Sequence, residues 1–120
     1  MTTPSKLRDL DPATVHDDLR AGRILLVDVR EPQEFAVERI HGAMLFPLST
    51  FDPAMLPQDP GKPIVFQCGS GKRSAMAAAK CREAGIAVNA HLAGGMMAWK
   101  AAGMPYVSLD SATGQVVDRR

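Results

Sequence analysis

Residues 63–73 read Pro63-Ile64-Val65-Phe66-Gln67-Cys68-Gly69-Ser70-Gly71-Lys72-Arg73 and join a short apolar run to a loop rich in glycine and basic residues. An alanine-rich, helix-like segment over residues 74–84 follows this loop. A short apolar run that ends in glycines before a longer helical segment is typical of a buried strand leading into a helix. The pattern predicts a strand over residues 64–66, a loop that opens at Cys68, and a helix from about Arg73 to Ala84 that stops at Gly85.

Similar signals alternate along the rest of the chain. Asp11 can cap a helix that starts at Pro12, and Gly22 is its expected stop. Residues 48–62 contain several prolines and leave room only for isolated helical turns, and the polar, aperiodic residues after Tyr106 predict a loosely ordered tail. The remaining predicted elements are strands over residues 24–29, 43–46 and 87–91 and helices over residues 32–37 and 95–102.

Alternating strands and helices predict an α/β fold with three layers, in which helices cover both faces of a central, mainly parallel sheet. In open sheets of this kind, ligands bind beyond the carboxyl ends of the strands. Cys68 lies at such an end. The chemistry of the loop and the geometry of the predicted fold therefore point to the same place.

The composition and charge of the chain argue against several classes of function. The 120 residues are enough for one domain, and the net charge of +1 gives no reason to expect binding to nucleic acid or to an anionic membrane surface. No apolar run approaches the roughly 20 residues that span a bilayer, and the start of the chain does not resemble a signal peptide. The two cysteines have neither disulfide-framework nor zinc-ligand spacing. We therefore expect a cytoplasmic protein without a metal or another cofactor.

Cys68 is the candidate nucleophile. A thiol between a strand end and a helix start faces backbone N–H groups and the positive end of the helix, and both favour the reactive thiolate. The alternative, a buried structural thiol, fits poorly with the surrounding glycines and basic residues. The loop is thus expected to hold a nucleophilic sulfur above an anion cradle. The residues predicted to bind the substrate are Gly69, Ser70, Gly71, Lys72, Arg73 and Ser74.

Several other residues have competing interpretations. Arg73 can pair with a carboxylate as readily as it binds a substrate anion, so both roles remain open. Cys81 lies within the alanine-rich helix, where packing is favoured over a second reactive thiol. Charges of alternating sign near the end of the strand over residues 24–29 favour a supporting ion-pair network over acid–base catalysis. This set consists of Asp28, Arg30 and Glu34.

Histidines and methionines give weaker signals. The histidines are scattered and no two have ligand spacing, so a metal site is not expected; they are His16, His41 and His91. A cluster of large apolar residues follows a glycine pair and could line a pocket or pack in the core. The sequence leaves both interpretations open for this cluster, which consists of Met96, Met97 and Trp99.

Three stretches resemble those of a single-domain rhodanese, a sulfurtransferase of the rhodanese and cell-cycle phosphatase superfamily. They occur in the order and spacing of that family: Leu26-Val27-Asp28-Val29-Arg30-Glu31-Pro32-Gln33-Glu34-Phe35 with Ile40-His41-Gly42-Ala43, then Cys68-Gly69-Ser70-Gly71-Lys72-Arg73-Ser74, then Leu92-Ala93-Gly94-Gly95-Met96-Met97-Ala98-Trp99 with Gly103-Met104-Pro105. The resemblance implies a rhodanese-like domain over residues 7–107 with a five-stranded sheet. Its first, very short strand is expected near residues 6–9, and residues 108–120 remain as the polar tail.

The resemblance also implies an activity. In this family the loop cysteine takes sulfane sulfur from a donor such as thiosulfate, holds it as a persulfide and passes it to an acceptor. Cys68 would carry the persulfide, and backbone N–H groups from Gly69 to Ser74 would hold it together with the oxygens of the anionic donor. The implied acceptors are cyanide, a thiol, or a sulfur-acceptor protein such as a thioredoxin-like one.

The length of the loop separates the two branches of the superfamily. Arg73 follows Cys68 in a Cys-x4-Arg pattern, whereas the related phosphatases use Cys-x5-Arg, and a shorter ring suits one sulfur atom better than a phosphoryl group. Gly69 departs from the basic residue that single-domain rhodaneses often carry there, and the start of the loop resembles that of mercaptopyruvate sulfurtransferases. The alternatives to a thiosulfate sulfurtransferase are therefore a mercaptopyruvate-type enzyme, a persulfide carrier, a phosphatase and a non-catalytic binding module.

Overall fold

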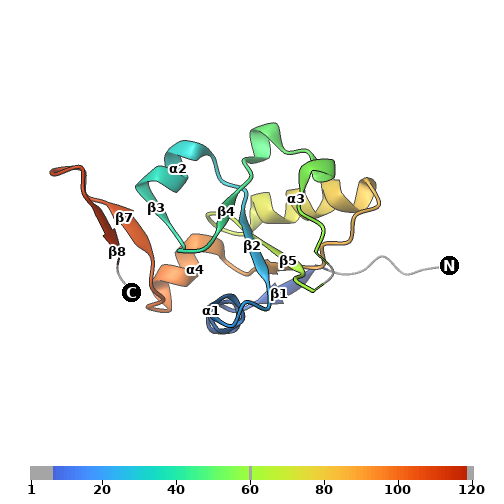
Figure 1. Ribbon diagram of the computed structural model, residues 1–120, viewed down its shortest axis with the longest axis horizontal. Helices are drawn as coiled ribbons and strands as arrows, with labels where there is room; N and C mark the ends of the chain where they lie inside the picture. Colours follow the sequence, from blue (N-terminus) through green and yellow to red (C-terminus); the bar gives the residue numbers. More distant parts are fainter. Residues whose placement is uncertain (1–6, 60, 119–120) are drawn as a thin grey trace.

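A computed structural model describes residues 7–59 and 61–118. Its centre is a five-stranded sheet in which every pair of neighbouring strands is parallel (Figure 1). This confirms the predicted fold class and the short first strand, although Lys6 lies outside the described residues. The strand order is β1 (Arg8–Leu10), β6 (Ala90–Leu92), β5 (Ile64–Gln67), β2 (Leu25–Asp28) and β4 (Met44–Leu45).

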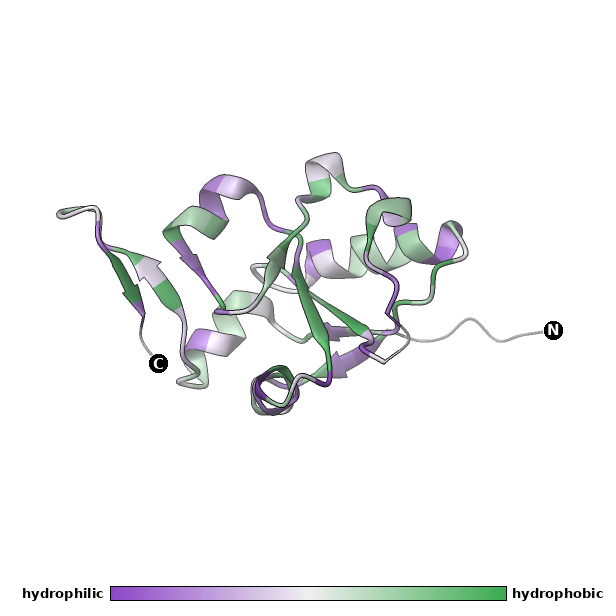
Figure 2. Ribbon diagram, viewed as in Figure 1, coloured by the Kyte–Doolittle hydropathy of each residue, from purple (hydrophilic) through white to green (hydrophobic). Residues whose placement is uncertain are grey.

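Helices cover both faces of the sheet, as the sequence predicted. The helices α1 (Pro12–Arg20) and α4 (Gly95–Ala101) lie on one side, and α3 (Lys72–Glu83) lies on the other. Side chains of the central strands alternate between the two cores: Leu26 and Val65 pack with α1 and α4, whereas Val27 and Phe66 pack with α3. Figure 2 shows β2 and β5 as hydrophobic along most of their length, which fits strands that are covered on both faces.

Capping residues mark the starts of two α-helices. The Asp11 side chain accepts a hydrogen bond of 3.2 Å from the Thr14 amide, with Pro12 at the first position of α1. A capping box between Glu31 and Glu34 starts α2 (Pro32–Val37). The proline-rich segment forms two 3₁₀ turns, η1 (Leu48–Thr50) and η2 (Pro53–Met55), as expected of isolated helical turns.

Strand β6 begins later than the sequence predicted. The expected strand covered residues 87–91, but the ladder with β5 and β1 starts at Ala90 and ends at Leu92. Val88 is instead packed into the core beside α3, and Ile86 lies against the same cluster. Ile86 and Val88 therefore anchor the connection between α3 and β6 in the core and do not extend the strand.

The C-terminal segment differs from the prediction of a loosely ordered tail. Strands β7 (Val107–Leu109) and β8 (Val116–Asp118) form an antiparallel hairpin, and β7 pairs with β3 (Glu38–Arg39) at one end of the molecule (Figure 1). The hairpin turn is closed by hydrogen bonds from Asp110 N to Gln115 O and from Gly114 N to Asp110 O. Two three-residue strands joined by a polar turn give little periodicity, so the sequence contained no clear signal for them.

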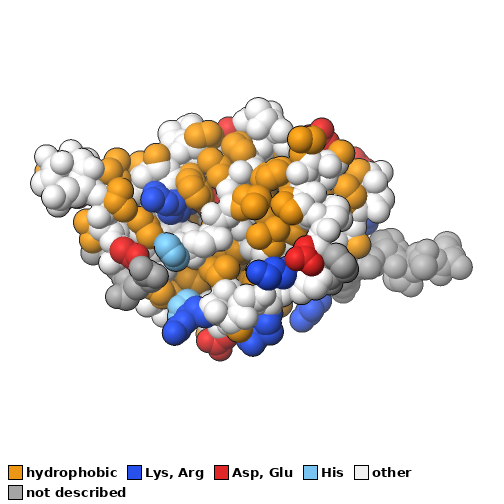
Figure 3. Space-filling model, in the orientation of Figure 1, with side chains coloured by type: hydrophobic (Ala, Val, Ile, Leu, Met, Phe, Trp, Pro, Cys, Tyr) orange, Lys and Arg blue, Asp and Glu red, His pale blue; other side chains and the backbone are white. Residues whose placement is uncertain are grey.

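The surface shown in Figure 3 is mixed. Apolar side chains are interspersed with single basic, acidic and histidine side chains on this face, in keeping with the small net charge. None of the helices in the described part of the chain is long and apolar enough to cross a bilayer.

Candidate active site

Cys68 lies directly after β5, a central strand of the sheet, and only 1% of its surface is exposed. Its sulfur accepts hydrogen bonds from two backbone amides of the loop, Gly71 N at 3.1 Å and Ser74 N at 3.3 Å. The Ser74 hydroxyl lies 3.7 Å from the same sulfur. The loop that opens at Cys68 is therefore wrapped around the sulfur, with the N–H groups of Gly71 and Ser74 pointing towards it.

The backbone conformation of Gly71 makes this wrapping possible. Its φ of +104° lies in the left-handed region, where a side chain would be strained, and it precedes the first residue of α3. The turn at Gly71 directs the loop amides and the N-terminus of α3, a helix of 12 residues, towards Cys68. Ser70 and Lys72 flank the turn and are exposed.

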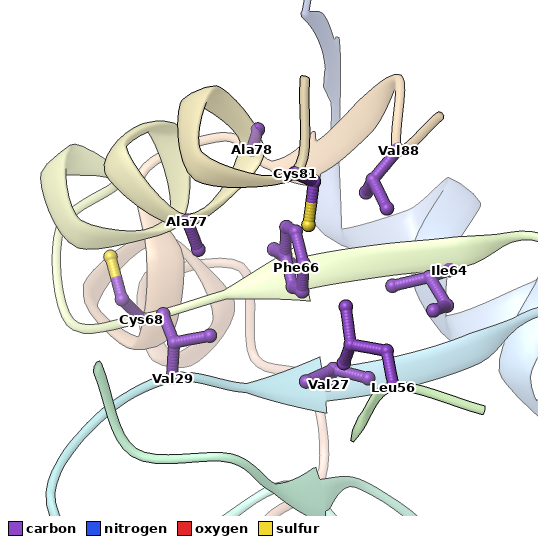
Figure 4. Packing of buried hydrophobic residues seen from close by; sticks show 10 residues of the cluster. All are labelled: Val27, Val29, Leu56, Ile64, Phe66, Cys68, Ala77, Ala78, Cys81 and Val88. Atoms are coloured by element: carbon purple, nitrogen blue, oxygen red, sulfur yellow. The ribbon is translucent and has the colours of Figure 1, made fainter. Parts of the chain in front are cut away.

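The two cysteines have opposite environments. Burial raises the pKa of the Cys68 thiol, but hydrogen bonds from the Ser74 amide and hydroxyl and from the amides of Gly71 and Ser70 outweigh burial, so its pKa lies below the ordinary value. Burial alone raises the pKa of Cys81. Figure 4 shows the Cys81 sulfur directed towards Phe66 in the core, whereas the Cys68 sulfur points towards the first turn of α3. The structure thus favours the packing interpretation of Cys81.

The start of α4 holds the loop from outside. The amide of Met96 donates to the Cys68 carbonyl at 2.8 Å, and the amide of Met97 donates to the Gly69 carbonyl at 3.1 Å. Gly95 permits this approach, because a Cβ at that position would lie 2.2 Å from the Cys68 carbonyl oxygen. The glycine pair is visible in the sequence but this role is not, since the contact joins segments that lie far apart in the chain.

The sequence left open whether the three large apolar residues after the glycine pair line a pocket or pack in the core, and the structure treats them differently. Met96 and Trp99 belong to α4 and are buried in the core on the α1 side of the sheet, and the Trp99 indole N–H donates to the Pro105 carbonyl at 2.7 Å. Met97 is 70% exposed, next to the loop residue Gly69 that its amide holds. Two of the three are thus core residues, and Met97 lies at the surface beside the site.

Arg73 pairs with a carboxylate. Its two terminal nitrogens donate to the two carboxylate oxygens of Glu34 at 2.6 and 2.9 Å. The guanidinium also lies against the loop, because a Cβ built on Gly69 would be 3.1 Å from Arg73 Nη2. Of the two roles that the sequence left open, the geometry supports an arginine that braces the loop against α2.

Asp28 and Arg30 form a separate, buried pair. The Arg30 guanidinium donates to both carboxylate oxygens of Asp28 at 2.9–3.1 Å and to the Glu38 carbonyl at 2.7 Å. Gln67, the last residue of β5, donates to Asp28 at 2.7 Å. Two residues of the predicted supporting set, Asp28 and Arg30, thus pair with each other and link β2 to β5 and β3. The third, Glu34 of α2, pairs instead with Arg73 at the start of α3.

The amino-acid sequence of this chain matches a known protein family. The sequence pattern of the family described as the rhodanese-like domain matches residues 11–102. The chain belongs to this family. The match includes Cys68, the loop and both ion pairs, so the resemblance noted in the sequence is confirmed.

Relatives of this rhodanese-like domain include proteins named as sulfurtransferases. An uncharacterized protein from Synechocystis sp. is 44% identical over 84% of this chain and 56% of its own length. A probable adenylyltransferase/sulfurtransferase from Mycobacterium tuberculosis is 41% identical over 75% of this chain and 24% of its own length. A sulfurtransferase from Allochromatium vinosum is 36% identical over 71% of this chain and 79% of its own length. The chain thus spans about half or less of the length of the first two relatives.

Solved structures share the fold. The rhodanese-like domain of an Anabaena sp. protein superposes with a TM-score of 0.72 at 26% identity, covering 93% of this chain and 88% of that one. A protein from Rhodopseudomonas palustris, described as of unknown function and a possible tyrosine phosphatase, gives a TM-score of 0.69 at 30% identity, covering 82% and 83%.

His91 of the rhodanese-like domain makes two polar contacts that the sequence did not predict. His91 of β6 lies 2.6 Å from the Ser74 hydroxyl through Nδ1 and 2.6 Å from an Asp9 carboxylate oxygen through Nε2. The sequence showed His91 only as one of three scattered histidines. No local spacing could have revealed these contacts, because Asp9, Ser74 and His91 come from three separate elements.

The Glu34–Arg73 pair predicts a specific pH dependence of stability. The hydrogen bonds from Arg73 lower the pKa of Glu34 from 4.5 to about 2. Because the folded state holds this carboxylate ionised, its contribution is complete above pH 4.5 and is lost as the pH falls from 4.5 towards 2. Both side chains are about one-third exposed, so we expect a modest contribution.

Glu34→Gln measures this contribution. Urea unfolding at several pH values should show the variant less stable than the wild type at pH 7, with the difference shrinking below pH 4.5. Glu83→Gln is the matched control, because Glu83 is exposed at the end of α3. A Glu34→Gln difference that stays constant down to pH 2 would contradict the ion pair as its cause.

Proposed function

We propose that this rhodanese-like domain is a sulfurtransferase that moves sulfane sulfur from thiosulfate or a related small anion to cyanide or a thiol through a persulfide on Cys68. The observation that carries the proposal is the ring of loop amides around the Cys68 sulfur, with Gly71 N and Ser74 N at 3.1 and 3.3 Å. Such a ring stabilises a negatively charged sulfur, and both the thiolate and the persulfide anion carry that charge.

The first half-reaction would be attack of the Cys68 thiolate on the outer sulfur of thiosulfate. A new S–S bond forms to Cys68, the S–S bond of thiosulfate breaks, and sulfite leaves with the electron pair. The charge of the thiolate passes to the terminal sulfur of the persulfide. The loop amides that bind the Cys68 sulfur, Gly71 N and Ser74 N, would have to reach the terminal sulfur one S–S bond away to stabilise this charge in the persulfide.

The second half-reaction would return Cys68 to the thiolate. Cyanide or an acceptor thiolate attacks the terminal persulfide sulfur, and the S–S bond to Cys68 breaks with its electron pair remaining on Cys68. The products are thiocyanate or the persulfide of the acceptor. No further oxidant, reductant or cofactor is needed, because the sulfur enters and leaves in the same oxidation state.

Lys72 and Ser70 are the residues best placed to meet the donor at the surface. Both are exposed beside the turn, whereas Arg73 is held by Glu34. A lysine at the first position of α3 adds to the positive end of that helix, which favours a small dianion such as thiosulfate over a monoanion such as mercaptopyruvate. This supports thiosulfate ahead of mercaptopyruvate as the donor.

A phosphatase is the second candidate, because the neighbour from R. palustris is described as a possible tyrosine phosphatase. Transfer of a phosphoryl group requires donors for three equatorial oxygens around the attacking sulfur. Here the ring between Cys68 and Arg73 is one residue shorter than the phosphatase pattern, and both terminal nitrogens of Arg73 bind Glu34. These features favour sulfur over phosphorus.

Treatment with thiosulfate followed by mass spectrometry tests the proposal. We expect a mass increase of one sulfur atom, mapped to the peptide that contains Cys68 and removed by cyanide as thiocyanate. Mercaptopyruvate as donor and an aryl phosphate as substrate form parallel arms. Sulfur found only on Cys81, no sulfur with any donor, or phosphate hydrolysis that depends on Cys68 would overturn the assignment.

The physiological acceptor and the cellular location belong to the same proposal. A low-molecular-weight thiol, a thioredoxin-like protein or another sulfur-acceptor protein would take the sulfur in a reducing cytoplasm. If the protein is mainly a persulfide carrier, turnover with thiosulfate and cyanide should be slow while Cys68 still becomes persulfidated. Steady-state rates measured beside the mass spectra separate these two roles.

A further inference from the structure

A chain of polar groups runs from the Cys68 sulfur to the protein surface. The Ser74 hydroxyl lies 3.7 Å from the sulfur and 2.6 Å from His91 Nδ1, and His91 Nε2 lies 2.6 Å from Asp9 Oδ1. The histidine side chain is only 9% exposed, whereas the side chain of Asp9 is 74% exposed. The chain therefore connects a buried thiol with solvent through one hydroxyl and one imidazole.

The fold assembles this chain from three elements. Asp9 of β1 and His91 of β6 are direct partners in the parallel register of the sheet, so their side chains lie side by side. Ser74 belongs to the first turn of α3, which starts beside the end of β5. His91 also lies beneath the loop, because a Cβ built on Gly71 would be 3.7 Å from its Cε1.

We propose that His91 accepts the proton of the Cys68 thiol through the Ser74 hydroxyl, and that Asp9 orients the imidazole for this transfer. The inference rests on the proposed function only in that Cys68 must act as a thiolate. His91 acts on the sulfur through Ser74 and is therefore a positioning residue. The proposal adds to the mechanism the group that receives the thiol proton, His91.

The protons balance in this scheme. Before transfer, the thiol donates to Ser74 Oγ, the Ser74 hydroxyl donates to His91 Nδ1, and His91 Nε2–H donates to Asp9. The S–H bond then breaks, Ser74 passes on its own proton and receives the thiol proton, and an N–H bond forms at His91 Nδ1. After transfer, Ser74 donates to the Cys68 thiolate, and the imidazolium donates to both Ser74 and Asp9. The Gly71 carbonyl, 3.0 Å from Ser74 Oγ, is a further acceptor for the same hydroxyl.

The loop amides alone do not supply this step. They stabilise the thiolate once it has formed, but a backbone N–H cannot take up a proton. Cys68 is almost completely buried, so its proton needs a route to water. Imidazole is the side chain whose ordinary pKa allows it to accept a proton near neutral pH and release it again.

The charged groups around His91 come from three elements. The Asp9 carboxylate faces it from β1, and the Cys68 thiolate lies behind Ser74 in the loop. On α3, Arg73 is paired with Glu34 and Lys72 is exposed. Two negative groups thus bracket the imidazole after the transfer.

His91→Asn separates a proton relay from a purely structural contact. The Asn side-chain amide can occupy the position of Nδ1 and accept a hydrogen bond from Ser74, but it cannot take up a proton at neutral pH. We expect the midpoint of Cys68 alkylation by iodoacetamide to rise by about one pH unit or more in this variant, because the imidazolium next to the thiolate is lost. At pH 6 the alkylation rate should fall about tenfold, and above the new midpoint it should recover to within about twofold of the wild type.

Two further variants complete the experiment. Asp9→Asn keeps a hydrogen-bond acceptor but removes the charge, so it should shift the midpoint in the same direction by a smaller amount, since Asp9 is exposed. His41→Asn makes the same change at an exposed histidine in the loop before β4 and should leave the midpoint unchanged. Circular dichroism of each variant reports on folding.

Alkylation needs no sulfur donor, so the outcomes separate this proposal from the proposed function. An unchanged midpoint in His91→Asn overturns the relay even if thiosulfate turnover is normal. An equal loss of rate at every pH also overturns it, because it would assign His91 a purely structural role. A raised midpoint with alkaline recovery supports the relay even if thiosulfate proves to be the wrong donor.

Discussion

Cys68→Ser is expected to reduce sulfur transfer to the uncatalysed background, a loss of roughly 10⁴-fold or more, because the reaction loses its nucleophile. A hydroxyl can occupy the same position between the loop amides, but it does not form a persulfide. The change is small and leaves a group that can accept the hydrogen bonds of Gly71 N and Ser74 N, so the fold should remain intact. Steady-state assays with thiosulfate and cyanide, together with circular dichroism, measure both effects.

Cys81→Ala is the matched control for this experiment. Cys81 belongs to α3 and is fully buried in the core, and burial raises its pKa, so it has no expected part in the chemistry. Loss of its sulfur should cost about 1 kcal/mol of stability by leaving a small cavity, with the transfer rate unchanged. A normal rate in Cys68→Ser, or a lost rate in well-folded Cys81→Ala, would contradict Cys68 as the site of the persulfide.

Gly95→Ala is expected to damage the site severely although Gly95 lies outside the loop that surrounds the sulfur. The new Cβ would lie 2.2 Å from the Cys68 carbonyl oxygen and 2.7 Å from the Gly69 carbonyl carbon, both of them backbone atoms of the loop. Loop and helix must move apart, which breaks the hydrogen bonds from Met96 N and Met97 N. A shift of about 1 Å in a reacting group can cost on the order of 100-fold in rate, and we expect at least that loss.

Gly103→Ala provides the control for backbone strain. Both glycines have positive φ, +57° at Gly95 and +73° at Gly103, but a Cβ at Gly103 would meet nothing within 4 Å. Each alanine costs about 1–2 kcal/mol for its left-handed conformation, and only Gly95→Ala adds the collision with the loop. Thermal unfolding and transfer rates of both variants separate the two effects. Equal losses of activity would mean that contact between α4 and the loop is unimportant.

The sequence by itself determined the central strand, the loop and the helix that follows it. An apolar run, a glycine-rich turn and an alanine-rich helix are adjacent in the chain, so local propensity and periodicity were sufficient to predict them. The start of α1, with Asp11 as its cap and Pro12 as its first residue, was predictable for the same reason, since a cap depends on residues three positions apart. The loop length and the family resemblance likewise depended only on neighbouring residues and on their order.

Tertiary structure decided which residues meet around Cys68. Glu34 and Arg73 are 39 positions apart, and Asp9 and His91 are 82 positions apart, yet each pair is in hydrogen-bond contact. Such contacts depend on strand order and register, which place β1 next to β6 and α2 next to the loop, and no local pattern encodes them. The close approach of Gly95 to the loop and the pairing of the C-terminal hairpin with β3 arise in the same way. The chain sequence thus specified the nucleophile and its loop, whereas packing of distant elements supplied the groups that brace the loop and reach its sulfur.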